Sequence, residues 1–224
     1  MSRSKLPSGR PRTKRIRRKR YLIACNGKVT EPQYFRFLLS ELGRNASSTT
    51  TIADRAAGKD PLILVKDTAQ IKKLEDKEAK KEGYDSFETV WAVTDADEFC
   101  LGEAQKTARK EGVSLILSNP CFEVWLIDHI RVCPDSCFPT KECQGYAVKQ
   151  GVVSSTASGR GKKRMKAICE DALRGRVNAA IKNAKKHNTD EKGLRRKTAV
   201  DNTASYAVWT DVADVVEALA GRRI

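Results

Sequence analysis

Short apolar runs alternate with segments of helical periodicity along the first 130 residues. Four runs have the length and the β-branched or aromatic content of strands: 20–25, 49–56, 88–94 and 113–117. Three segments between them repeat apolar side chains at helical spacing: 31–44, 61–81 and 101–111. Strands that alternate with helices predict an α/β fold, with a mostly parallel central sheet and helices on both faces.

The pattern changes after about residue 131. A connection with cysteine, proline and glycine leads to the Ser- and Gly-rich residues 154–161, which we interpret as a flexible loop. Apolar positions from Met165 to Ala184 predict one long helix or a broken pair, and residues 206–220 predict a final helix. We therefore expect three parts: a disordered basic tail (1–19), an α/β core (20–131) and a basic helical extension packed on the core (132–224).

Two predicted helices carry start signals. Thr30 followed by Gln33 has the form of a capping box. Asn119 followed by Pro120 has the form of an N-cap and a first helical residue. We accordingly expect helices to begin at about residues 30 and 120.

Composition limits the cellular setting. Hydrophobic residues make up 40% of the chain, as in ordinary globular proteins. No run approaches the roughly 18 apolar residues of a membrane span, and no apolar core of an export signal follows the basic N-terminus. We expect a cytoplasmic protein without a membrane partner, whose seven cysteines are reduced.

The formal net charge of +15 is unevenly distributed. Residues 1–20 contain ten basic and no acidic residues, and residues 160–197 contain fourteen basic and four acidic ones, which leaves −5 for the rest. Such segregation is typical of a nucleic-acid contact surface beside an acidic, cation-binding site. The alternative is that the tail and a solvated helix only aid solubility.

Acidic residues directly follow several predicted strands. Ligands of parallel sheets bind at these carboxyl ends of the strands. Glu31 follows the first strand, Asp95 and Asp97 follow the central one, and Glu123 follows another. Residues i and i+2 of an extended segment point the same way, so the two aspartates can converge on one or two Mg²⁺ or Mn²⁺ ions. The alternatives are turn chemistry for the aspartates and helix-dipole stabilisation for Glu31.

One further group could bind zinc. His129, Cys133, Cys137 and Cys143 lie close in sequence, but their spacing matches no compact standard zinc pattern. His129 also falls in a segment rich in apolar residues, where a packed histidine is the simpler interpretation. Whether this group binds zinc stays open at this point.

Three motifs together resemble the RloB-like family in their order and spacing. They are Asn26-Gly-Lys-Val-Thr-Glu-Pro-Gln-Tyr-Phe35, Thr94-Asp-Ala-Asp-Glu98 and Ser118-Asn-Pro-Cys-Phe-Glu-Val-Trp-Leu-Ile-Asp-His129. The resemblance covers residues 20–130 well and continues more loosely through residues 202–205 and the final helix. It leaves out the basic tail and the cysteine-bearing loop.

The resemblance implies a compact Toprim-like fold with a metal-dependent nuclease-type site, in restriction-linked and abortive-infection defence against phage. Glu31, Asp95 and Asp97 match the family's acidic positions and would be catalytic metal ligands. Glu123 would be a further ligand, with Ser118 beside it. The resemblance also implies an ATPase partner, which fits the lack of a nucleotide-binding glycine motif in the chain.

One position departs from the Toprim pattern. Toprim-like proteins usually have Glu followed by Gly after the first strand, whereas this chain has Asn26 and Gly27. An asparagine carbonyl can coordinate a cation, but the side chain cannot serve as a general base. Either Glu31 takes over proton transfer or catalysis is lost.

The leading hypothesis is therefore a Mg²⁺- or Mn²⁺-dependent nuclease acting on RNA or DNA. Five basic residues would hold the substrate backbone: Lys28, Arg160, Lys162, Lys163 and Arg164. One alternative is a non-catalytic nucleic-acid-binding adaptor or sensor subunit for the ATPase partner, and another is nucleotidyl transfer at the same metal site. Oligomerisation is compatible with each.

Overall fold

A five-stranded sheet forms the centre of the protein, in a computed structural model that describes residues 19–53, 60–96, 99–155 and 166–221. Its strands lie in the order β2-β1-β3-β4-β7. The first four run parallel and β7 pairs antiparallel with β4. The strand bounds are β1 Arg20–Cys25, β2 Thr50–Ala53, β3 Phe87–Asp95, β4 Ser114–Asn119 and β7 Trp209–Thr210. The mixed α/β class with a mostly parallel sheet is confirmed, whereas Toprim-like identity stays a prediction.

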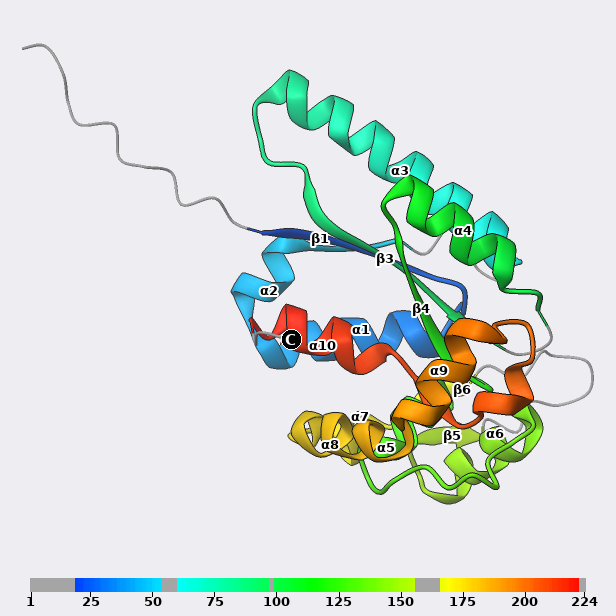
Figure 1. The fold of residues 1–224 in the computed structure, drawn as a ribbon. Helices are drawn as coiled ribbons and strands as arrows, with labels where there is room; N and C mark the ends of the chain where they lie inside the picture. The colour runs from blue at the N-terminus through cyan, green and yellow to red at the C-terminus, as the bar shows by residue number, and fades with distance from the viewer. Residues whose placement is uncertain (1–18, 54–59, 97–98, 156–165, 222–224) are drawn as a thin grey trace, which may run out of the picture.

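Helices cover both faces of this sheet (Figure 1). One face packs against α3 (Pro61–Glu82) and α4 (Gly102–Glu111), and the other packs against α1 (Thr30–Leu42), α5 (Glu123–Asp128) and α10 (Val212–Leu219). Alternation along β1 explains the two layers, because Leu22 and Ala24 point to the first face and Ile23 and Cys25 to the second. A short helix, α2 (Arg44–Thr49), precedes β2.

The C-terminal part of the chain joins the core. It contains α6 (Thr140–Lys149), the hairpin of β5 (Val153–Ser155) and β6 (Lys166–Ile168), α7 (Glu170–Leu173), α8 (Val177–His187), α9 (Asp190–Thr198) and the 3₁₀ helix Thr203–Tyr206. Strand β7 then extends the central sheet, and α10 buries its valines against it. The predicted domain boundary between residues 131 and 132 stays a prediction. Segments from both sides of this boundary contribute to one sheet and one core.

Three local predictions were wrong. Helix α1 does begin at Thr30, but Val29 occupies the N-cap and no side chain caps it. Asn119 ends β4 and α5 begins only at Glu123, because Asn119 pairs with Trp209 of β7 and remains in the sheet. Residues 166–168 form strand β6 rather than the start of a long helix, since they pair with β5.

The hydrophobic content is spread over the amphipathic helices. None of the described helices combines the length and the apolar composition needed to cross a membrane.

Candidate metal and nucleic-acid site

The carboxyl ends of β1, β3 and β4 meet at one edge of the sheet. The backbone N–H of Asn26 donates to the carbonyl of Val93 at 2.9 Å, and that of Ala96 donates to the carbonyl of Ser118 at 2.8 Å. These bonds continue the parallel pairing one residue beyond each strand. The turns that carry the predicted site residues are therefore held side by side.

Glu31 lies in the first turn of α1 and folds back over the turn after β1. Its side chain is buried, with only 5% of its surface exposed, and its carboxylate accepts hydrogen bonds from the backbone N–H groups of Gly27 and Glu31 itself. A Cβ atom at position 27 would lie 1.7 Å from Oε2 of Glu31. Gly27 is thus required because the carboxylate occupies the space of a side chain.

Glu123, the first residue of α5, is the second buried carboxylate of this site. The pKa of Glu31 is raised to about 7, chiefly by burial and also by the negative charge of Glu123, against the backbone hydrogen bonds that lower it. Two buried carboxyl groups of like charge therefore interact electrostatically at this edge. A cation placed between them would relieve the repulsion.

Asp95 ends β3 and connects it to the start of α5. The backbone N–H of Phe122 donates to Oδ1 of Asp95 at 2.8 Å. The bond therefore holds Asp95 against the residue that immediately precedes Glu123. A carboxylate has about four lone-pair sites and can therefore accept several contacts at once.

Three of the four predicted metal ligands, Glu31, Asp95 and Glu123, lie at this edge of the sheet, while Asp97 lies outside the described residues. Among the described residues, the carboxylate oxygens of these three side chains do not all lie within 4.8 Å of one another. The donor set consists of hard oxygen atoms, which fits Mg²⁺ or Mn²⁺.

Asn26 and Ser118, predicted as neighbours of the site, both act as braces between strands. The Asn26 amide donates to the hydroxyl of Thr94 at 3.1 Å. The Ser118 hydroxyl shares a 2.9 Å hydrogen bond with the hydroxyl of Thr210 on β7. Asn26 therefore ties the first turn to β3, and Ser118 ties β4 to the C-terminal strand.

The predicted basic residues are only partly described. Lys28 is exposed in the turn between β1 and α1, next to Gly27. Arg160, Lys162, Lys163 and Arg164 lie outside the described residues, as does the basic tail 1–18. The hairpin strand β6, which follows residues 156–165, lies beside α1 because the N–H of Ile168 donates to Oε1 of Gln33 at 3.1 Å.

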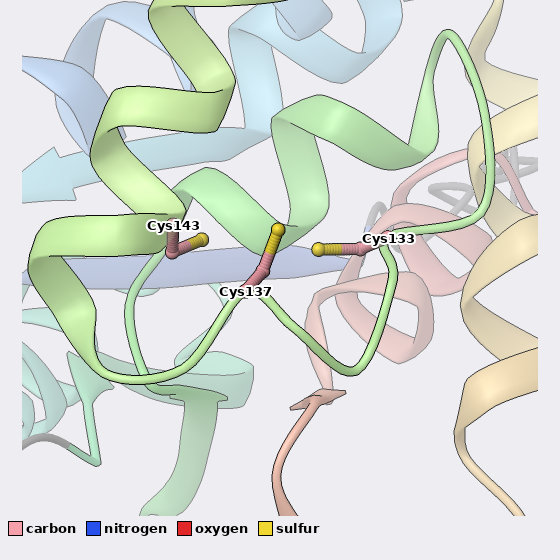
Figure 2. A group of neighbouring side chains, drawn as sticks. All are labelled: Cys133, Cys137 and Cys143. Atoms are coloured by element: carbon pink, nitrogen blue, oxygen red, sulfur yellow. The ribbon is translucent and has the colours of Figure 1, made fainter.

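His129 does not join the three cysteines of the possible zinc group. His129 packs among aromatic rings, with Nε2 3.4 Å from the Tyr34 hydroxyl and Nδ1 3.1 Å from the carbonyl of Trp125. Burial lowers the pKa of His129 to about 4, so it is neutral at pH 7. His129 is therefore a packed residue, while the sulfur atoms of Cys133, Cys137 and Cys143 meet (Figure 2).

Sequence reasoning missed two contributions to the site. The backbone N–H of Phe122 holds Asp95, and a backbone donor carries no residue-type signal. Asp211 braces the neighbouring strand end, because its Oδ2 accepts from the N–H of Leu117 at 3.0 Å and from Arg196. The contact between Leu117 and Asp211 joins positions 94 residues apart, which no local sequence pattern indicates.

Comparison with known proteins identifies the family. A family model described as RloB-like protein matches residues 21–219, so the chain belongs to the RloB-like family. No curated protein and no solved structure matches it. The match extends through the C-terminal part that contributes β7 and α10.

Proposed function

We propose that this member of the RloB-like family is a Mg²⁺- or Mn²⁺-dependent phosphodiesterase that cleaves RNA or DNA in a phage-defence system of the cytoplasm. The observation that carries the proposal is that two buried carboxyl groups, Glu31 and Glu123, interact electrostatically at the carboxyl end of the sheet. Buried like charges repel each other, and a cation bound between them would offset that repulsion. Their position at the ligand-binding edge of a parallel sheet supports a binding role.

We assign each acidic residue of the site a role in cation binding or proton transfer. A bound Mg²⁺ or Mn²⁺ ion would lower the pKa of water and neutralise charge on a phosphate. Glu31, Glu123 and Asp95 would hold the ion, with Asp97 proposed as a further ligand. Glu31 would be ionised once a cation binds, and as a carboxylate it could accept a proton from water, a role that the Asn26 amide cannot perform.

Basic residues would supply substrate affinity. Lys28 is exposed beside Gly27, where it can contact a phosphate that reaches the carboxylates. The β5–β6 hairpin, anchored on α1, carries the segment with Arg160, Lys162, Lys163 and Arg164. We propose that this segment and the tail contact the nucleic-acid backbone without sequence preference. An ATPase partner is proposed as well, from the family resemblance.

Incubation of the purified chain with tRNA, single-stranded RNA, supercoiled DNA and linear DNA tests this proposal, with Mg²⁺ or Mn²⁺ present. We expect the wild type to cut at least one substrate and Asp95→Asn to lose the activity. Asparagine keeps an oxygen that can accept from the N–H of Phe122, so the fold should be retained. The matched control is Glu78→Gln, an exposed acidic position on α3, which should cut like the wild type.

A specific observation favours a second function, that of a non-catalytic adaptor. The side chain after β1 is an amide hydrogen-bonded to Thr94, a bracing role rather than a catalytic one. If the wild type binds the polyanions but cuts none of them, even with its ATPase partner added, the adaptor function replaces the nuclease. If Asp95→Asn cuts as fast as the wild type, the carboxylates are not the catalytic site.

A further inference from the structure

Three buried thiols point toward one another next to α5. Cys133 and Cys137 lie in the connection after α5, and Cys143 lies in α6. Their sulfur atoms all lie within 4.8 Å of one another, and none of the three residues is more than 1% exposed (Figure 2). In a tetrahedral zinc–thiolate centre the sulfurs are about 3.8 Å apart, which follows from a Zn–S distance of about 2.3 Å.

The connection around these thiols buries little else. Between residues 131 and 142, Cys133 and Cys137 are the two buried residues, and Phe138 is 38% exposed. An apolar core usually holds a connection through several aliphatic or aromatic side chains. Here the inward positions are both cysteines, so a centre that binds both would fix the segment.

Backbone hydrogen bonds present the thiols from a defined scaffold. The N–H of Cys133 donates to Oδ1 of Asp128 at 3.0 Å, and Oδ2 of the same buried carboxylate lies 2.8 Å from Nε2 of His187 on α8. The N–H of Cys137 donates to the carbonyl of Pro134 at 2.9 Å. A C-x₃-C turn of this kind falls within the two- to four-residue spacing of zinc-binding cysteine pairs.

A fourth thiol lies beside the group. Cys121, between β4 and α5, is fully buried, and its thiol contacts that of Cys143 in a hydrogen bond. Its sulfur does not belong to the set that meets within 4.8 Å, so it adjoins one corner of that set. Because its thiol interacts with that of Cys143, Cys121 is our candidate for the fourth ligand.

We propose that Cys133, Cys137 and Cys143, completed by Cys121, bind one Zn²⁺ ion in a closed structural site. Four soft sulfur ligands in tetrahedral array select Zn²⁺ over the Mg²⁺ or Mn²⁺ of the carboxylate cluster. A disulfide would join two thiols and leave two buried ones over. The site is separate from the proposed function, and it would remain if the chain cut no nucleic acid.

The zinc site would fix the geometry of the carboxylate cluster. Cys121, Phe122 and Glu123 are consecutive, and the N–H of Phe122 holds Asp95. A metal bound through Cys121 therefore fastens the turn that presents two of the three described carboxylates. The proposed zinc ion would act as a structural support rather than as a reactant.

Metal analysis of the purified full-length chain tests the proposal. The protein is expressed with zinc in the medium, purified without chelators under reducing conditions, and measured by inductively coupled plasma mass spectrometry. We expect about one zinc per chain, and no visible absorption of an iron–sulfur cluster. Cobalt substitution should give the intense visible bands of tetrahedral thiolate coordination.

Cysteine-to-serine variants identify the ligands. Cys137→Ser should lose the zinc, whereas Cys100→Ser, an exposed cysteine away from the cluster, should keep it. Cys121→Ser should bind zinc at least about tenfold more weakly than the wild type. Unchanged affinity in Cys121→Ser would overturn the assignment of the fourth ligand.

Wild-type protein decides the matter even if the variants do not fold. A chain that contains no zinc as purified, and takes up neither Zn²⁺ nor Co²⁺ after full reduction, overturns the proposal. So does an iron–sulfur chromophore in place of zinc, or a disulfide between two of these cysteines in protein prepared from reducing cytoplasm.

Discussion

Glu31 combines two properties that rarely coincide in one carboxylate. It is buried, and a second buried carboxyl group, Glu123, acts on it with a like charge. Both properties favour the protonated form and raise its pKa to about 7. The same side chain would therefore release its proton when a cation binds, which couples metal affinity to pH.

This coupling predicts a pH dependence of stability. The unfolded chain releases the Glu31 proton near pH 4.5, whereas the folded chain keeps it up to about pH 7. The stability present below pH 4.5 is therefore lost as the pH rises through 7. In Glu31→Gln this loss should disappear, which would make the variant more stable than the wild type at pH 8 by up to about 3 kcal/mol.

Urea unfolding at pH 5 and pH 8, without added divalent cation, measures this difference. Glu78→Gln should follow the wild type at both pH values, because its side chain is exposed. Equal pH slopes for Glu31→Gln and the wild type would show that Glu31 ionises normally in the folded state.

Gly27 provides a second test at the scale of single residues. In Gly27→Ala the new Cβ would collide with Oε2 of Glu31 and displace the carboxylate. We expect the Kd for Mn²⁺ to rise by about tenfold or more, as for residues that support metal ligands. Gly145→Ala, where a Cβ meets nothing within 4 Å, is the control. An unchanged Kd in folded Gly27→Ala would mean that the Glu31 position is unimportant for binding.

At the scale of elements, a segment distant in sequence caps a helix of the core. The N-terminus of α4 is capped by Asp201, whose Oδ1 accepts from the N–H of Leu101 at 2.5 Å and of Gly102 at 2.9 Å. Asp201→Ala should lower the free energy of unfolding by about 1 kcal/mol, the usual contribution of a cap. Asp201→Asn keeps an acceptor oxygen and should recover most of it. Thermal or urea unfolding measures both, and equal stability of Asp201→Ala and the wild type would exclude the capping role.

The central elements could be predicted from the sequence because their pattern matches their surroundings. The apolar run at 88–94 lies in the middle of the sheet and is buried from Val90 to Thr94, and β3 spans Phe87–Asp95. The start of α5 was predicted wrongly because β7 pairs with Asn119 and keeps it extended. Short pairings across 90 residues override a local helix-start signal, and no local pattern reveals them.

The candidate site was predictable to a similar degree. Glu31, Asp95 and Glu123 follow strands, and strand order alone brings them to one edge. The meeting of Cys133, Cys137 and Cys143 was open at the sequence level, because their irregular spacing depends on how the connection after α5 folds back against α6. His129 is a packed residue, as its apolar segment predicts, and its ring contacts Tyr34 and Trp125.

At the scale of the whole molecule, charge segregation predicts a salt-dependent contact with nucleic acid. Residues 1–18 contain eight basic and no acidic side chains. Removing them should weaken binding to tRNA or DNA and reduce the slope of log K against log salt, since each phosphate contact contributes a slope of about −0.7 to −0.9. Fluorescence anisotropy at several salt concentrations measures the slope. An unchanged slope would show that the tail only aids solubility.

The central claim is that the carboxylates at the sheet edge form a divalent-cation site, and calorimetric titration with Mg²⁺ and Mn²⁺ tests it most directly. Neither ion competes well for the cysteine cluster, because that cluster offers only soft sulfur ligands. We expect saturable binding to the wild type and to Glu78→Gln, and at least about tenfold weaker binding to Glu31→Gln and Asp95→Asn. Equal affinity in all four proteins, or no binding to the wild type, would contradict it.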